Sequence, residues 1–195
     1  TFDPENLVYF CHIQFARPVY HYGFLNQILN ILISVSFYTS KLLISEKELN
    51  TIRGLKKKKR LREITKISSK IKLCKDTKKL LPTYSREGLK ITIEHNDLEL
   101  KGSFEGRKTL STVDARKILE KISDEDVIIL GLDPKFCRPE GLILTVLPVP
   151  PPHVRPAVSM SSSQRCEDDL THKINDILKT NIALKNAIDN NNLPH

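Results

Sequence analysis

A run of prolines, at Pro148 and from Pro150 to Pro152, constrains the fold of this 195-residue chain more than any other feature. Proline has no backbone N–H to donate and its ring fixes φ, so the run disfavours both helix and interior strand. The residues before it, Leu142 to Leu147, are apolar and rich in β-branched types, as in a buried strand. The sequence therefore predicts a buried strand that ends at Pro148 and continues as a stiff extended arm, which Arg155-Pro156 prolongs.

The segment after this arm changes character twice. From Ser159 to Arg165 the residues are mostly small and polar without periodicity, which predicts a mobile loop. The acidic residues 167–169 then favour the N-terminus of a helix, because the free N–H groups there attract negative charge. Apolar residues at helical spacing form a face that we expect to pack on the domain, namely Leu170, Ile174, Ile177 and Leu178. The run from Asn190 to Asn192 ends the predicted helix.

Another helix is predicted in the apolar stretch from Phe24 to Ile44, beginning near Gly23. Its hydrophobic residues keep helical spacing, at Phe24, Ile28, Ile31, Leu32 and Val35. Polar residues interrupt the stretch, at Asn26, Gln27, Asn30 and Lys41. The stretch therefore predicts a helix packed inside the protein rather than a membrane span.

The net charge of +8 is concentrated in one part of the chain, since residues 41–90 hold 17 Lys and Arg against 5 Asp and Glu. Such a block is typical of a polyanion-binding surface or of a solvated helix, and the run from Lys56 to Arg62 also resembles a nuclear-import signal. Residues 47–79 predict a broken helix with Gly54 as the interruption. We expect no fixed structure for residues 56–60.

Two shorter patterns complete the secondary structure. The alternation of Leu89, Ile91 and Ile93 predicts a strand, and Asn96-Asp97 predicts a turn into a partner strand containing Leu98 and Leu100. Ser111 and Ser123 each precede an acidic residue by three positions, which predicts two consecutive capped helices. The apolar residues Ile118, Leu119 and Ile122 share one face of the first.

Several motifs resemble the largest subunit of RNA polymerase II and occur in the same order as in that family. They are Arg138-Pro139-Glu140, the residues from Leu144 to Pro152, Val154-Arg155-Pro156 and the residues from Glu167 to Lys173, with a shorter match at His12-Ile13, Ala16 to Val19 and His21 to Leu25. The resemblance implies an α+β fold, a mixed and irregular clamp-type domain with short sheets and helices. It also implies that the chain is an incomplete part of a larger multi-domain subunit.

The resemblance divides the chain into three parts. Residues 1–44 are the N-terminal part of the clamp with its apolar helix, residues 45–87 are a basic, partly disordered insertion, and residues 88–195 are the clamp core with the proline arm. The loop 156–168 corresponds to the lid, which lies where the RNA transcript separates from template DNA. There the resemblance implies that Met160 is an apolar wedge against a base, Arg165 a cation for a phosphate and Gln164 a hydrogen-bonding group.

The implied function is to hold DNA and the RNA–DNA hybrid in the nucleus, together with other polymerase subunits and away from any membrane. The chain itself has no motif of closely spaced carboxylates for the two Mg²⁺ ions of nucleotidyl transfer, so it is an enzyme only as part of the polymerase. Its carboxylate run Asp124-Glu125-Asp126 predicts the first turn of a helix. We therefore expect no catalytic residue here and a Mg²⁺ site outside this chain.

The same resemblance implies zinc, because the family carries two Zn²⁺ sites in this region with paired cysteine ligands. Here Ser36 and Thr39 stand where one Cys pair is expected, and Leu80 stands where another Cys is expected. Hydroxyl and alkyl groups do not replace thiolates, so we expect no metal in this chain. The four cysteines are scattered, which predicts reduced thiols, and Cys11-His12 is interpreted as ordinary structure.

Other interpretations remain open from the sequence. The prolines include a PxxP pattern between Pro148 and Pro151, which proline-recognition domains bind, although His153 stands where such ligands carry a cation. The serine-rich loop has the composition of a passive linker. A decayed copy without function is a further alternative.

Overall fold

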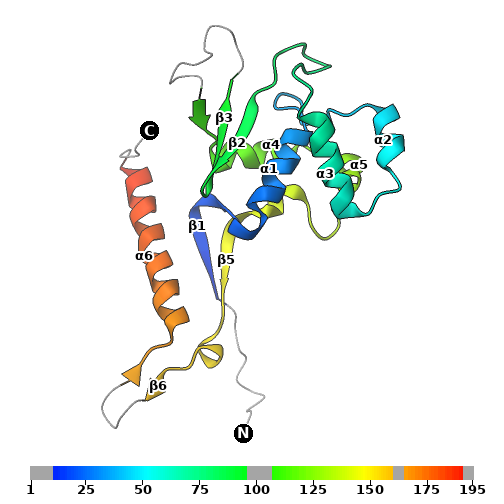
Figure 1. The fold of residues 1–195 in the computed structure, drawn as a ribbon. Coiled ribbons are helices and arrows are strands. Elements are labelled where there is room, and N and C mark those ends of the chain that lie inside the picture. The colour runs from blue at the N-terminus through cyan, green and yellow to red at the C-terminus, as the bar shows by residue number, and fades with distance from the viewer. Residues whose placement is uncertain (1–10, 96–106, 160–164, 191–195) are drawn as a thin grey trace. The chain divides into compact units, whose positions relative to one another are not determined.

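The computed structural model describes residues 11–95, 107–159 and 165–190, and it confirms a mixed α+β fold with short antiparallel sheets (Figure 1). The described residues form two compact units. We name residues 19–143 the core unit, and residues 11–18 with 144–190 the arm unit. The chain passes from one to the other within strand β1 (Cys11–Tyr20) and again within strand β5 (Ile143–Val149). The three-part division along the sequence stays a prediction.

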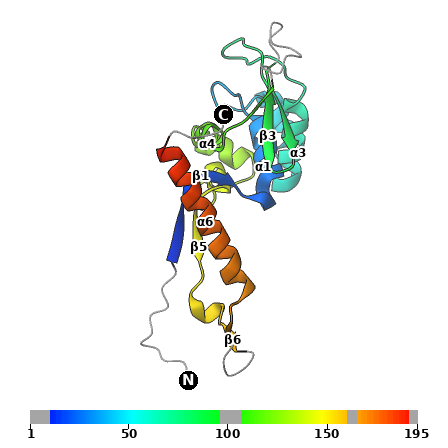
Figure 2. The same cartoon turned by 90° about the vertical axis from the view of Figure 1, so that its left-hand side faces the viewer.

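Helix α1 (Leu25–Ser34) is the centre of the core unit and confirms the predicted helix, which ends at Val35 rather than continuing toward Ile44. A short 3-10 turn, η1 (Tyr22–Phe24), leads into it. Ile28, Ile31 and Leu32 are fully buried. The helix packs against helix α3 (Lys57–Ser68) and strand β2 (Thr83–Glu87), as Figure 2 shows from another side. None of the helices within the described residues is long and apolar enough to cross a membrane.

The basic segment folds into two helices, α2 (Glu46–Ile52) and α3, with Gly54 in the connection as predicted. The helical pattern predicted as far as residue 79 is wrong beyond Ser68, where α3 ends and turns follow. Ser45 caps α2 through a capping box with Glu48. The expectation that residues 56–60 lack fixed structure is wrong, because α3 begins at Lys57. Tertiary contacts described below hold this helix start.

A three-stranded antiparallel sheet covers α1, in the order β2, β3 (Lys90–Glu94) and β4 (Arg107–Thr109). Strand β3 confirms the predicted alternation, with Ile91 and Ile93 buried, but Leu89 lies in the turn before it. The predicted turn at Asn96-Asp97 and its partner residues Leu98 and Leu100 lie outside the described residues. The described hairpin joins β2 to β3 around Gly88, whose φ of 59° suits glycine.

Helices α4 (Thr112–Glu120) and α5 (Asp124–Ile129) begin at the two predicted serine caps. Ser111 accepts a hydrogen bond from the N–H of Val113, and Ser123 accepts one from Asp126. Ile118, Leu119 and Ile122 are buried, as predicted. The acidic run at the start of α5 is the first turn of a helix, so that interpretation is also confirmed.

The arm unit contains β1 and β5, which pair as a two-stranded sheet, and helix α6 (Asp169–Asp189). The prediction that the strand stops at Pro148 is wrong, because β5 continues through Pro148 to Val149. Pro148 is exposed, and a two-stranded sheet tolerates a missing N–H on an outer side. The strand is also less buried than expected, since only Ile143 and Val149 are buried.

The proline arm does not remain extended. A 3-10 turn, η3 (Pro152–Val154), interrupts it, and two short strands follow, β6 (Val158–Ser159) and β7 (Arg165–Cys166), which pair antiparallel. The predicted continuous rod through Arg155-Pro156 is therefore wrong. The stems of the predicted loop are strands that pair with each other.

Helix α6 confirms the helix predicted after the acidic residues, with Asp168 as its N-cap and Asn190 at its end. Its apolar face is not packed as expected, because Leu170, Ile177 and Leu178 are exposed and no residue of α6 is buried. The side-chain amide of Asn181 joins the helix to β1. It accepts a hydrogen bond from the N–H of Ala16 at 2.8 Å and donates one to the carbonyl of Gln14 at 2.9 Å.

Candidate nucleic-acid interface

Helix α3 presents the densest positive charge of the core unit. Its apolar residues Leu61 and Ile64 are buried in the core. The cations of this segment point away from that face and are exposed, at Lys56, Lys57, Lys58, Lys59, Arg62 and Lys66. Within the described chain no carboxylate pairs with Lys56 to Lys59. A row of exposed, unpaired ammonium groups is the chemistry that contacts phosphates.

The start of α3 is locally unfavourable as a helix. Lys56, at the N-cap, makes no side-chain capping bond, and the first turn carries lysines instead of acids, although the helix dipole disfavours cations there. Tertiary contacts compensate. Arg60 donates a hydrogen bond to the carbonyl of Ile128 at 3.1 Å, and Gly131 approaches so closely that a Cβ there would lie 3.0 Å from the Lys57 carbonyl oxygen. Lysines therefore occupy the first turn of α3, although local helix electrostatics disfavour cations at that position.

Arg155 fixes the base of the proline arm. Its Nε donates a hydrogen bond to the carbonyl of Pro150 at 3.1 Å, and its Nη1 donates one to the Thr171 hydroxyl at 3.0 Å. Pro150 precedes the predicted loop and Thr171 follows it. One guanidinium therefore connects the chain on both sides of the loop.

The loop itself leaves from the paired stems β6 and β7. Val158 faces Cys166 and Ser159 faces Arg165 in their register. Of the predicted lid residues, Met160 and Gln164 lie outside the described residues, and for Arg165 the structure describes only the backbone, in β7. The structure thus brings the two ends of the predicted lid together and leaves its predicted contact residues untested.

A hollow of about 390 Å³ adjoins the base of this arm. Arg155, His153, Glu167 and Asp168 contribute its polar groups. Asp168 already caps α6, and Arg155 already bonds Pro150 and Thr171. Two of these polar groups, those of Arg155 and Asp168, therefore serve the local structure of the arm.

Arg138 of the Arg-Pro-Glu motif has a structural role in the core unit. Its guanidinium pairs with Glu140 at 2.6 Å, pairs with Asp124 and donates to the carbonyl of Ile122 at 3.0 Å. It thereby ties the junction of α4 and α5 to the 3-10 turn η2 (Pro139–Leu142) before β5. The carboxylate of Asp124 is engaged in this brace.

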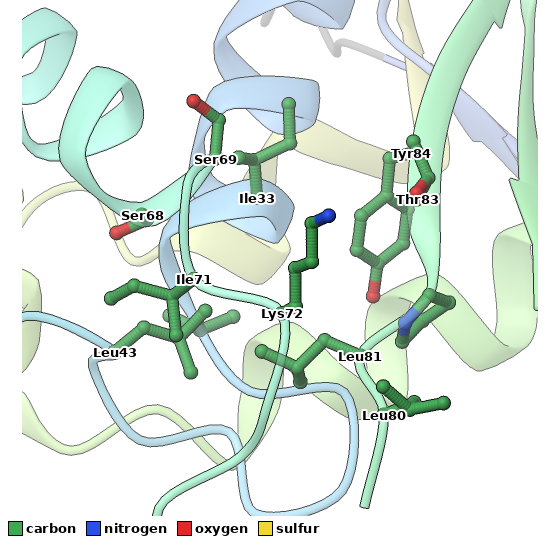
Figure 3. A pocket seen from close by; sticks show the side chains of 12 residues that line it. Ile33, Leu43, Ser68, Ser69, Ile71, Lys72, Leu80, Leu81, Thr83 and Tyr84 are labelled. Atoms are coloured by element: carbon green, nitrogen blue, oxygen red, sulfur yellow. The ribbon is translucent and has the colours of Figure 1, made fainter. Parts of the chain in front are cut away.

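A pocket of about 460 Å³ lies between the end of α1, the end of α3 and the start of β2 (Figure 3). Lys72 and Tyr84 are the large polar side chains around it, and its other lining residues are mostly apolar. Burial raises the pKa of Tyr84, so its phenol stays protonated. The lining contains no carboxylate, imidazole or thiol, so this pocket offers neither a general base with a nucleophile nor a set of metal ligands.

A family model described as RNA polymerase Rpb1, domain 1, matches residues 3–195. The chain belongs to this family. It is 38% identical to the DNA-directed RNA polymerase subunit Rpo1N of Methanocaldococcus jannaschii, over 93% of this chain and 14% of that protein. It is 37% identical to the DNA-directed RNA polymerase II subunit RPB1 of Euplotoides octocarinatus, over 94% of this chain and 42% of that protein.

A third relative is the Rpo1N subunit of Methanothermobacter thermautotrophicus, 36% identical over 93% of this chain and 21% of that protein. The chain thus spans between 14% and 42% of the length of these relatives. The predicted resemblance to the largest RNA polymerase subunit is confirmed at the level of the Rpb1 domain 1 family. The archaeal and type II relatives are about equally similar, so the type of polymerase stays a prediction.

Zinc is the metal that the resemblance implies, and the residues of this Rpb1 domain do not fit it. Ser36 and Thr39 offer hydroxyls and Leu80 offers no donor atom, whereas structural zinc takes thiolates and imidazoles. Cys11 and His12 lie on β1 in the arm unit, while Cys74 is buried in the core unit. Across the described ranges no group of three or more His, Cys, Asp or Glu side chains gathers in a way that could hold a metal ion.

Sequence reasoning does not find the residues that hold the arm unit together. The sequence patterns assign Arg155 to the extended arm and to a family motif, and they give Asn181 no role. An arginine directly before proline in an otherwise apolar arm is an available signal, because a buried or half-buried arginine needs carbonyl or hydroxyl acceptors. The contacts of Asn181 join residues that are separated by 165 and 167 positions in the sequence, so no local pattern predicts them.

Proposed function

We propose that this chain is the clamp part, with its lid, of the largest subunit of a DNA-directed RNA polymerase, and that it holds DNA and the RNA–DNA hybrid. The observation that carries the proposal is the arm. Arg155 and the pairing of β6 with β7 bring both ends of the loop 156–168 to one fixed base. A loop held in this way can act as an obstacle between two strands, which a passive linker cannot.

The proposed lid contacts are Met160, Gln164 and Arg165. An apolar methionine provides a surface against an unstacked base, and an arginine provides a cation for a phosphate. Gln164 hydrogen-bonds sugar or phosphate. The chain thereby contributes strand separation and no step of bond formation.

The exposed lysines at the start of α3 support a second contact, with the phosphates of DNA. Because this contact is electrostatic, the chain binds DNA weakly, without sequence preference and with an affinity that falls as salt rises. The energetic cost of placing cations at a helix N-terminus supports a role for them beyond the fold.

Nucleotidyl transfer belongs, in this proposal, to the assembled polymerase, whose Mg²⁺ site lies outside this chain. The exposed apolar residues Leu170, Ile177 and Ile182 of α6 suit burial against the rest of the subunit or against another polymerase subunit. We assign the polymerase to type II and its location to the nucleus. The Euplotoides relative supports that assignment by its name and its 37% identity.

No observation favours the alternative of a surface ligand for proline-recognition domains. Such ligands present a continuous polyproline helix, whereas here β5 includes Pro148, Pro151 is buried and η3 turns the chain at Pro152. The carbonyl of Pro150 is already bound by Arg155. The linker alternative is likewise weakened by the paired stems.

The test is a graft of residues 143–190 into a complete, related polymerase, with and without the double substitution Met160→Gly and Arg165→Ala. We expect the double variant to lengthen the RNA–DNA hybrid while extension of a short primer by one nucleotide stays nearly unchanged, because the metal-bound carboxylates are elsewhere. The matched control is Ser161→Ala with Ser163→Ala in the same loop, which should change neither. Equal loss of both activities, or of neither, would show that the loop has a different role.

A further inference from the structure

Two turns of the core unit repeat the same hydrogen-bonding pattern. We name residues 36–41 turn A and residues 74–79 turn B. In each, the first N–H donates to the sixth carbonyl, at 2.8 Å in turn A and 2.9 Å in turn B, and the fifth N–H donates to the first carbonyl at the same two distances. The fifth residue is left-handed in both, with φ of 56° at Ser40 and 53° at Lys78. A left-handed non-glycine residue is uncommon, so its recurrence marks one turn type used twice.

In both turns the backbone aims its N–H groups at the side chain of the first residue. The N–H groups of Tyr38 and Thr39 donate to Ser36 Oγ, each at 3.3 Å. In turn B the equivalent N–H groups, of Asp76 and Thr77, hydrogen-bond the sulfur of Cys74. Burial raises the pKa of Cys74, but these bonds and those from the Ser36 and Thr77 hydroxyls outweigh it and bring the pKa to about 7.

The two turns face each other through their first residues. Ser36 Oγ and Cys74 Sγ are 3.2 Å apart, and both residues are buried. The first and fourth positions of the turns are Ser36 and Thr39 in turn A, and Cys74 and Thr77 in turn B. Two facing turns that each offer their first and fourth residues have the ligand spacing of a tetrahedral zinc site.

The donor atoms at these positions are wrong for zinc, since three of the four are hydroxyls. One of these hydroxyls also lacks a hydrogen-bond partner among the described residues. Thr39 Oγ1 is buried and has no hydrogen-bond partner within the described chain, although a buried hydroxyl is normally paired. This is expected of a side chain that the turn geometry places at a metal-ligand position where no metal is bound.

Direct contacts between the turns connect them in the way that a bound metal ion would. Besides the Ser36–Cys74 hydrogen bond, the Tyr38 hydroxyl donates to the carbonyl of Leu80, next to turn B, at 3.1 Å. The ammonium of Lys79 lies 5.5 Å from the centre of the Tyr38 ring. The exposed pair of Lys41 and Asp76, at 3.6 Å, adds a weak attraction. Tyr38 thus contacts turn B or the residue after it in two ways.

We infer that turns A and B are a metal-free form of a tetrahedral zinc site, in which contacts between the turns hold them together and Thr77 stands at the fourth ligand position. Leu80, the residue singled out from the sequence, pairs with Leu73 in an isolated bridge and lines the pocket of Figure 3. It follows turn B and is not one of its ligand positions.

The first experiment uses the unaltered chain, purified without chelator. We expect less than one zinc in ten chains and an unfolding midpoint that a strong chelator leaves unchanged, whereas Tyr38→Phe lowers the midpoint because the carbonyl of Leu80 loses its donor. One tightly held zinc per chain, with a midpoint that falls on chelation, would overturn the inference. This measurement needs no variant that binds metal.

The second experiment rebuilds the site with Ser36→Cys, Thr39→Cys and Thr77→Cys beside the native Cys74. We expect a Co²⁺ complex with the thiolate charge-transfer absorption of a tetrahedral four-sulfur site. The matched control adds the same number of thiols but carries Leu80→Cys in place of Thr77→Cys, and should bind Co²⁺ about 100-fold more weakly because it offers one thiolate fewer in the right geometry. Equal binding by both triple variants would refute the assignment of Thr77.

Discussion

Helices α3 and α6 are stabilised in opposite ways. Helix α3 has no N-terminal cap and carries lysines at its positive end, yet Ile64 is fully buried and Leu61 nearly so. Helix α6 is capped by Asp168 and runs for 21 residues, yet none of its residues is buried. Helix α3 is stabilised mainly by packing against neighbouring elements, whereas local sequence contributes much more to the stability of α6.

This contrast indicates which face of each helix is available to contact other molecules. In α3 packing fixes the buried face, so the opposite face can carry charge that local preference would remove. In α6 the apolar residues remain exposed, and our proposal assigns this apolar face to contact with another part of the polymerase. The following predictions test the contrast, beginning with the largest effect.

Truncating a buried residue of α3 should cost far more than truncating an exposed one of α6. We expect Ile64→Ala to lower the free energy of unfolding by about 3 kcal/mol through lost burial and a cavity, and Ile177→Ala to lower it by less than about 0.5 kcal/mol. Urea unfolding followed by circular dichroism measures both. Similar losses in the two variants would mean that α6 packs as tightly as α3.

Removing charge should affect nucleic-acid binding only in α3. We expect Lys57→Gln, Lys58→Gln and Lys59→Gln together to weaken binding of duplex DNA about tenfold or more at low salt, and to reduce the slope of log affinity against log salt by up to about 3. Fluorescence anisotropy across a salt series gives both values. The matched control changes three lysines of α6, Lys173→Gln, Lys179→Gln and Lys185→Gln, and an equal loss there would locate the phosphate contacts elsewhere.

The smallest effect concerns the two N-caps. We expect Asp168→Ala to destabilise α6 by about 1 kcal/mol, because the N–H of Leu170 loses its acceptor, and Lys56→Ala to leave α3 unchanged, because Lys56 caps nothing. Hydrogen exchange of the first-turn amides in each helix reports the change. Faster exchange in α3 after Lys56→Ala would contradict the view that packing alone holds its start.

The same contrast explains how much of the fold the sequence predicts. Helices α1, α4, α5 and the start of α6 follow from periodicity and caps, which are local signals. The start of α3 escapes prediction because lysines and a missing cap argue against it, while the carbonyl of Ile128 that stabilises it is far away in the chain. Strand β2 escapes because its residues are mostly exposed and show no alternation.

The candidate site likewise has parts that the sequence predicts and parts that it does not. The existence of a loop after the prolines follows from its composition, but its stems β6 and β7 have two residues each, too few for any period. The turns at Ser36 and Cys74 lie 38 positions apart, so only the folded chain reveals that they match. Turn A itself contains no glycine at its left-handed position, which removes the usual sign of such a turn.

The closed base of the arm has a consequence for the length of the loop between Ser159 and Arg165. Since Arg155 and the paired stems already bring its ends together, extra residues there add only the entropy of a longer closed chain. Doubling such a loop costs about 0.6 kcal/mol. Its length and composition can therefore vary between relatives, or be redesigned, while the arm that presents it keeps its conformation.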